Sequence, residues 1–109
     1  MRANNVTREI LLGFWKVHIL HHAAERPIYG QWIADELRHH GYHISPGTLY
    51  PLLARMEANG WLKGLASREP SLRRRKEYRL TAEGKKILTF LRAQVKELHN
   101  EVVPKPVAR

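Results

Sequence analysis

The sequence predicts a mainly α-helical fold with a small β-hairpin, arranged as a winged helix-turn-helix with a further helix at each end. Three observations lead to this fold class. Two short helical segments are joined by a turn that contains glycine, which is typical of a helix-turn-helix. The hydrophobic period then changes from helical to alternating on both sides of a polar loop, as in a hairpin. Long segments of helical periodicity precede and follow these elements.

The first helix is predicted over residues 8–24, with Thr7 as its N-cap and Pro27 beyond its end. Apolar side chains lie on nearly all of its sides, and a helix of this kind is buried on more than one side. In a chain of 109 residues, we expect one side to face the chain's own core and another to face a partner subunit.

The helix-turn-helix follows. Its first helix is predicted over residues 31–40 and is stopped by Gly41. Its second helix is predicted over residues 44–58, with Ser45 as N-cap and Pro46 at the first helical position. This second helix is the candidate recognition helix.

The hairpin is predicted next, with strands over residues 61–65 and 76–80 and a polar loop over residues 66–75. Thr81 is a weak N-cap for a last helix that ends near Val102. Its apolar residues recur at spacings of 4, 4, 3 and 4, close to the heptad seam of a coiled coil: Ile87, Leu91, Val95, Leu98 and Val102.

These elements predict three parts. Residues 1–80 form the winged helix-turn-helix DNA-binding domain, residues 81–103 a C-terminal dimerisation helix, and residues 104–109 a flexible tail. The predicted dimer interface combines apolar residues of the first and last helices: Ile10, Phe14, Val17, Ile87, Leu91, Val95, Leu98 and Val102.

On the predicted recognition helix, a helical wheel separates a core face from an open face. The core face consists of Leu49, Leu52, Leu53 and Met56, and the open face of Gly47, Pro51, Ala54 and Ala58. Thr48 and Arg55 flank the open face on one side and Tyr50 on the other. A face with small residues in its middle and hydrogen-bonding groups at its edges suits the major groove of DNA. Pro51 is predicted to bend the helix axis.

The distribution of charge along the chain also favours binding to DNA. The net charge is +9, and residues 41–80 carry the largest excess, with eight basic and three acidic side chains. The excess peaks at residues 73–76, in the predicted hairpin beside the recognition helix. We expect Arg68 and this basic run to contact flanking phosphates or the minor groove.

Other classes of protein are excluded or disfavoured. The chain has no cysteine, which excludes disulfides, thiolate zinc sites and cysteine nucleophiles. It contains no catalytic motif and no convergent acid and base pair, so we expect a non-enzyme without a cofactor. No apolar run has the length of a membrane helix, and the N-terminus lacks a signal-peptide core, which predicts a cytoplasmic protein that does not enter the membrane.

Four segments resemble the PadR family of bacterial transcriptional repressors: Tyr29-Gly30, residues 44–53 (ISPGTLYPLL), residues 56–62 (MEANGWL) and residues 75–84 (RKEYRLTAEG). The resemblance covers about residues 8–100 and is to the compact subfamily with one C-terminal helix. It implies a homodimer in which the terminal helix packs across the partner's first helix. It also implies a repressor that is often released by a small aromatic or drug-like ligand. Glu77 departs from the family, which often has an aromatic residue there.

The resemblance places DNA contacts at Tyr29, Ser45, Thr48 and Tyr50 and on the basic wing. Together with the helical wheel, it yields the full predicted DNA-binding set: Tyr29, Ser45, Gly47, Thr48, Tyr50, Arg55, Arg68, Arg73, Arg74, Arg75 and Lys76. The predicted function is sequence-specific binding of a palindromic operator in double-stranded DNA by a homodimeric repressor. A small-molecule effector pocket is predicted from Phe14, Trp15 and Phe90, the aromatic residues of the two interface helices.

Three alternatives remain open at this point. A basic winged helix can bind RNA instead of DNA. The last helix can be the working surface of an interaction module that binds no nucleic acid. The histidines can form a metal sensor, since His18 and His22 have the four-residue spacing of a metal-binding pair and His21 is beside them. The remaining histidines near the helix-turn-helix are His39, His40 and His43. We expect histidines at such positions to be surface or interface residues, and we predict no metal site.

Overall fold

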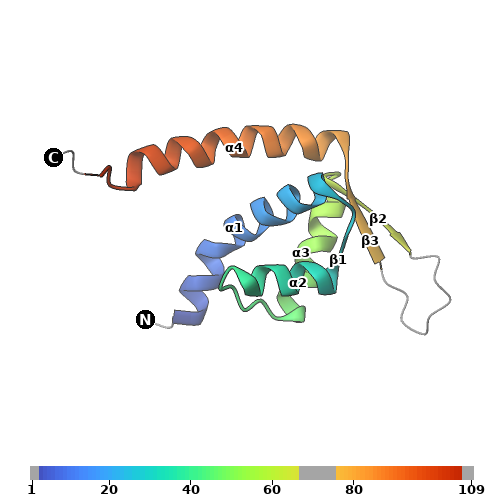
Figure 1. The fold of residues 1–109 in the computed structure, drawn as a ribbon. Coiled ribbons are helices and arrows are strands. Elements are labelled where there is room, and N and C mark those ends of the chain that lie inside the picture. The colour runs from blue at the N-terminus through green and yellow to red at the C-terminus, as the bar shows by residue number, and fades with distance from the viewer. Residues whose placement is uncertain (1–2, 67–75, 107–109) are drawn as a thin grey trace.

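The computed structural model describes residues 3–66 and 76–106, and the side chains from Arg8 onward within those ranges. Within them the elements follow in the order α1 (Ala3–Glu25), β1 (Ile28–Tyr29), α2 (Gly30–His39), α3 (Pro46–Ala58), β2 (Leu62–Ala66), β3 (Lys76–Leu80) and α4 (Ala82–Val102), as Figure 1 shows. The predicted mainly helical, winged helix-turn-helix fold class is confirmed.

The predicted start of the first helix is wrong. α1 begins at Ala3, so Thr7 is not its N-cap; residues 3–7 contain neither glycine nor proline, and nothing there stops the helix. α3 begins at Pro46 with Ser45 as its N-cap, as predicted, and the two residues before it that the predicted range included are not helical, because a residue before proline is kept out of helical backbone. Ser45 accordingly has an extended ψ of 153°. The other predicted ends of helices and strands lie within a residue or so of those observed.

The sheet has three strands in the order β1-β3-β2, all antiparallel, and is therefore larger than the predicted hairpin. The additional strand, β1, pairs with the opposite edge of β3, where Ile28 lies beside Tyr78. On the other edge of β3, Gly64 of β2 is the partner of Tyr78. A strand of two residues is too short to show an alternating pattern, which is why periodicity misses β1.

Glycines end the two helices of the helix-turn-helix, as predicted for Gly41. Gly41 and Gly60 have positive φ angles of 89° and 81°, a backbone conformation that glycine adopts without steric cost. After α2, the amide of Tyr42 donates to the carbonyl of Leu37 at 2.9 Å, which closes the helix end. The turn that leads to α3 is therefore set by local backbone chemistry.

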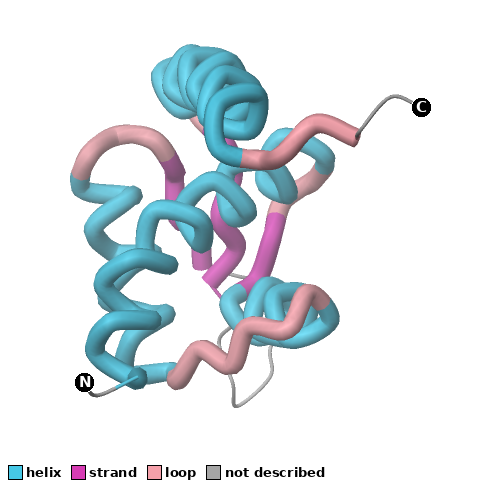
Figure 2. The backbone as a smooth tube through the Cα atoms, turned by 90° about the vertical axis from the view of Figure 1, so that its left-hand side faces the viewer, coloured by secondary structure: helices cyan, strands magenta, loops and turns pink. Residues whose placement is uncertain are grey.

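The core lies between α1, α2, α3 and the sheet, and α4 adds Leu88 to it. The four residues predicted as the core face of α3 are all buried: Leu49, Leu52, Leu53 and Met56. Figure 2 shows the three N-terminal helices around the strands, with α4 on one side of this body. None of the described helices is long and apolar enough to cross a membrane.

The start of α4 is fastened to the end of α3. Thr81 caps α4, as its oxygen accepts a hydrogen bond from the amide of Gly84 at 2.9 Å, and its hydroxyl donates to the carbonyl of Gly60 at 2.6 Å. A Cβ at Gly84 would overlap the carbonyl oxygen of Trp61, so only glycine permits this close approach. The direction in which α4 leaves the body is thereby fixed.

Candidate nucleic-acid interface

α3 presents a face of small side chains to solvent. Its exposed residues there are Gly47, Pro51, Ala54 and Ala58, the four that the helical wheel predicts. Arg55 is exposed and Thr48 half-buried at one edge of this face, and Tyr50 is 47% exposed at the other. The helix continues through Pro51, from Pro46 to Ala58. No long side chain along its middle prevents a close approach to a groove.

Two hydroxyl groups lie together at the start of α3. Ser45 is the N-cap, but its side chain makes no capping hydrogen bond to the backbone. Its hydroxyl instead donates to the hydroxyl oxygen of Thr48 at 3.2 Å. The amides at a helix start favour anions, so this end of α3 combines a favourable local dipole with two groups that can bind phosphate or base edges.

Arg8 of α1 belongs to the same surface and is a residue that the sequence analysis missed. A shallow depression of about 180 Å³ is shared by α1 and α3. Its lining residues are Arg8, Leu12, Gly47, Thr48, Pro51, Leu52 and Arg55. Arg8 and Arg55 thus flank the small-residue face with two cations. No sequence pattern relates Arg8 to a helix almost forty residues later, so only the tertiary structure reveals it.

Tyr50 packs against the corner between β1 and α2. A Cβ at Gly30 would lie 2.6 Å from Cε1 of the Tyr50 ring, so the absence of a side chain at Gly30 makes room for that ring. Next to it, the hydroxyl of Tyr29 donates to Glu77 at 3.2 Å. The two predicted tyrosines are therefore held at one corner, Tyr50 exposed and Tyr29 half-buried.

An ion pair fastens the strands of the wing to α3. Lys76 Nζ lies 2.6 Å from Oε1 of Glu57, whose other oxygen accepts a hydrogen bond from the amide of Gly64 at 3.0 Å. The hydrogen bond from Lys76 lowers the pKa of the Glu57 carboxyl and raises the pKa of Lys76. Lys76 was predicted as a DNA contact, and its charge is paired within the chain. The pair links the first residue of β3 to α3.

Glu77 is also engaged within the chain. Its Oε1 accepts a hydrogen bond from Arg79 at 2.8 Å, and its Oε2 accepts from Tyr29. These hydrogen bonds, that from Arg79 foremost, lower the pKa of the carboxyl group. The remaining predicted wing contacts lie outside the described residues: Arg68, Arg73, Arg74 and Arg75.

The predicted dimer residues divide into two groups. Val17, Ile87 and Leu91 are half-buried, with Ile87 and Leu91 packed against the chain's own core. The others are exposed: Ile10, Phe14, Val95, Leu98 and Val102. Every residue from Arg92 to Val102 is exposed, and Figure 1 shows this half of α4 extending past the body. A partly apolar helix is thus left without a covering layer within one chain.

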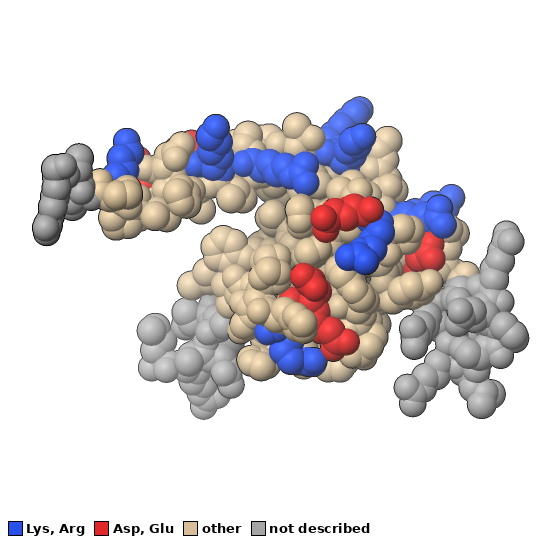
Figure 3. Space-filling model, viewed as in Figure 1, with Lys and Arg blue, Asp and Glu red and all other residues tan. Residues whose placement is uncertain are grey.

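The lysines of α4 and the apolar residues of its seam occupy different sides of the helix. Figure 3 shows basic side chains along its outer side, whereas acidic side chains gather on the body below. The exposed cations of this helix are Lys85, Lys86, Arg92 and Lys96. Arg92 differs from the three lysines because it lines the pocket between α4 and α1 together with Val95 of the seam.

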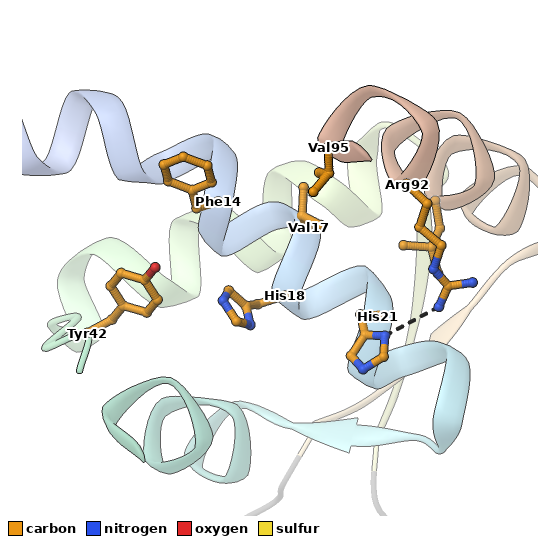
Figure 4. A pocket seen from close by; sticks show the side chains of 8 residues that line it. Phe14, Val17, His18, His21, Tyr42, Arg92 and Val95 are labelled. Carbon is orange, nitrogen blue, oxygen red and sulfur yellow. Dashed lines mark hydrogen bonds between the residues drawn. The ribbon is translucent and has the colours of Figure 1, made fainter. Parts of the chain in front are cut away.

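A pocket of about 330 Å³ lies between α1 and α4 (Figure 4). Its lining residues are Phe14, Val17, His18, His21, Tyr42, Leu88, Arg92 and Val95. At one end Arg92 donates a hydrogen bond to Nδ1 of His21 at 3.3 Å. Of the three aromatic residues predicted for an effector pocket, the structure brings only Phe14 here. Trp15 is buried in the core, 5% exposed, and Phe90 is exposed outside the lining.

Three histidines come together where α1 meets the end of α2. His18, His22 and His40 form this cluster, and burial, followed by the charges of the neighbouring histidines, lowers the pKa of His18. A second group consists of His21, His22 and Glu25. Spacing along the chain identifies the pair on α1, but only the tertiary structure adds His40.

Comparison with known proteins relates the chain to transcriptional regulators. Residues 19–89 match the model of the "Transcriptional regulator PadR-like family". The curated protein named transcriptional regulator Rv3488, from Mycobacterium tuberculosis, is 45% identical over 96 residues, which are 88% of this chain and 89% of that protein. A PadR-like transcription factor from Bacteroides fragilis is 31% identical with a TM-score of 0.78, over 90% of this chain and 95% of that one. A PadR family regulator from Eggerthella lenta is 30% identical with a TM-score of 0.73, over 91% and 90%.

Proposed function

Since this chain belongs to the PadR-like family of transcriptional regulators, which are DNA-binding regulators and not enzymes, we propose that it is a homodimeric repressor of a palindromic operator, released by a small ligand. The observation that carries the proposal is the outer face of α3, with small residues in its middle and hydrogen-bonding groups at its edges. A helix of that shape fits the major groove of double-stranded DNA. The A-form major groove of RNA is too deep and narrow for it, which disfavours RNA as the partner.

The contacts on each half-site have two roles in this proposal. Thr48, Tyr50 and Arg55 reach base edges from the two sides of α3, while Ser45 and the amide of Gly47 bind phosphate at the helix start. Arg8 and Tyr29 contact the backbone beside the groove. The wing adds Arg68, Arg73, Arg74 and Arg75, with Lys76 acting through its ion pair with Glu57.

The dimer is proposed to cover the apolar seam of α4. Leu98 and Val102 are 46% and 62% exposed, and apolar residues at heptad spacing are buried when two such helices pack together. The exposed Ile10 and Phe14 of α1 supply a second apolar surface for the partner's α4. A two-fold dimer places two recognition helices on successive half-sites, which is why we propose a palindromic operator.

The ligand is proposed to enter the pocket between α1 and α4. Its walls are mostly apolar, with the Phe14 ring and the Arg92 guanidinium at its sides, which suits a flat aromatic molecule with a hydrogen-bond acceptor. Because α4 carries the proposed dimer seam, a ligand there would change how the two DNA-binding units are spaced. The first pocket prediction is thereby revised, with Phe14 kept and Trp15 and Phe90 omitted.

Footprinting of the purified protein on DNA upstream of its own gene tests the proposal. We expect protection of one palindrome whose half-sites are centred one helical turn apart or a multiple of it. Protection of a single unpaired half-site would contradict the dimer, and the absence of salt-sensitive binding to any duplex would contradict DNA binding itself.

Conservative substitutions at the edges of α3 test whether these residues contact bases or phosphates. Tyr50→Phe keeps the ring that packs against Gly30 and removes only the hydroxyl, and Thr48→Ala removes the other edge hydroxyl. Each is expected to weaken operator binding by about 5- to 100-fold and to leave binding to random duplex nearly unchanged, because base contacts carry specificity. Anisotropy titrations with both duplexes measure this. Equal losses on the two duplexes would make these residues phosphate anchors.

A further inference from the structure

We propose that His18, His22 and His40, together with Glu36, bind a divalent transition-metal ion of the zinc class where α1 meets the end of α2. Neither the DNA-binding surface nor the pocket at Phe14 requires such an ion. The sequence predicted that these histidines are ordinary surface or interface residues. Their arrangement in the tertiary structure favours a metal site instead.

The geometry of the cluster supports this. One ring nitrogen from each histidine lies within 4.8 Å of the others. Zinc–nitrogen bonds of about 2.0–2.1 Å place tetrahedral donor atoms about 3.3 Å apart, so small side-chain rotations are sufficient to close the site. His18 and His22 lie one turn apart on α1, and His40 is the C-cap that follows the last residue of α2. The two elements thus bring the three rings together at one place.

His22 supplies the second, independent observation. Its side chain is 10% exposed, and its Nε2 atom has no hydrogen-bond partner among the described residues. A buried polar atom without a partner is rare and costly. The other ring nitrogen, Nδ1, lies 3.2 Å from a carboxylate oxygen of Glu25. A ligating histidine commonly donates its second N–H to a carboxylate, so the His22 ring is oriented with Nε2 available to an ion.

Glu36 supplies the carboxylate. Its Oε1 lies 3.4 Å from Nε2 of His40 and 3.9 Å from Nε2 of His22, so it borders the three-histidine group on the side of these two rings. A surface hollow of about 410 Å³ reaches these residues and gives an ion access from solvent. Arg26 also lines the hollow, and its guanidinium carbon lies 4.7 Å from the ring centre of Trp32. Three imidazoles and one carboxylate suit zinc, whereas calcium and magnesium prefer oxygen ligands.

Titration of the untagged chain, freed of metal by a chelator, tests the site. We expect one Zn²⁺ per chain by calorimetry, visible absorption bands of tetrahedral Co²⁺ when cobalt replaces zinc, and no binding of Mg²⁺. Saturating Zn²⁺ is expected to raise the Tm by about 5 °C or more, because the ion binds only the folded chain. No DNA is present, so the result does not depend on the proposed repressor function.

Variants locate the ion. His18→Gln and His40→Gln are expected to weaken Zn²⁺ binding by at least about 10-fold and to abolish the Co²⁺ bands, with circular dichroism confirming that the variants fold. His39→Gln and His43→Gln are the matched controls, since both residues are exposed and outside the cluster, and they are expected to bind as the wild type does. Equal losses in the controls would overturn the proposal. So would loss of binding in His21→Gln with none in His18→Gln, because the ion would then lie in the other group.

Discussion

The double variant Leu98→Asp/Val102→Asp is expected to be a folded monomer that binds the operator at least about 100-fold more weakly than the wild type. Both side chains are largely exposed in one chain, so aspartates there leave the chain's own core intact. In a dimer, the same aspartates would be buried against apolar side chains without a partner, which is strongly unfavourable. Once dimerisation is lost, each recognition helix must bind its half-site alone.

The control for this variant carries the same charge on the opposite side of the same helix. Ala93→Asp/Asn100→Asp places two aspartates about 180° from the seam at residues exposed to solvent. It is expected to remain a dimer with near wild-type affinity. Sedimentation velocity gives the oligomeric state, circular dichroism the helix content, and anisotropy the affinity. A monomeric wild type, or a Leu98→Asp/Val102→Asp variant that remains dimeric, would refute the proposed interface.

Removing three wing arginines, by Arg73→Ala, Arg74→Ala and Arg75→Ala, is expected to weaken binding to every duplex by about 100-fold or more at 0.15 M salt. Each phosphate contact contributes about 0.9 to the salt dependence of the binding constant, so six lost contacts per dimer lower the slope of log K against log[salt] by about 5. Lys76 and Arg79 cannot compensate fully, because both are paired with glutamates.

The matched control removes the same number of charges elsewhere. Lys85→Ala, Lys86→Ala and Lys96→Ala take three cations from exposed positions of α4. If the wing arginines contact DNA phosphates directly, the slope of log K against log[salt] for this control stays close to that of the wild type. Equal changes in the two triple variants would mean that only the net charge of the chain matters. The assignment of phosphate contacts to the wing arginines would then be wrong.

Local sequence signals determined much of the fold. Glycine with a positive φ stops α2, a proline starts α3, and 3.6-residue periodicity assigns the core face of α3, because each of these effects acts within one or two turns of helix. The open face of α3 follows from the same wheel. For these elements the sequence prediction needed no knowledge of the remaining chain.

The candidate site depended more on contacts between distant segments. β1 becomes a strand only because Tyr78 of β3 lies beside Ile28. The ion pair between Glu57 of α3 and Lys76 of β3 joins residues that are 19 positions apart in the sequence. Such pairings have no periodic signal, since they arise from packing and not from the geometry of one helix or strand.

For this protein, the sequence by itself determined the class: a basic winged helix-turn-helix with a seam at its last helix and the motifs of the PadR family. Only the tertiary structure decided which side chains share a surface. In the folded chain Arg8 lies beside α3, Trp15 is buried in the core, and His40 lies next to the histidines of α1. The physical reason is that backbone preference and periodicity are encoded locally, whereas a binding site is a set of contacts that exists only after the helices have packed.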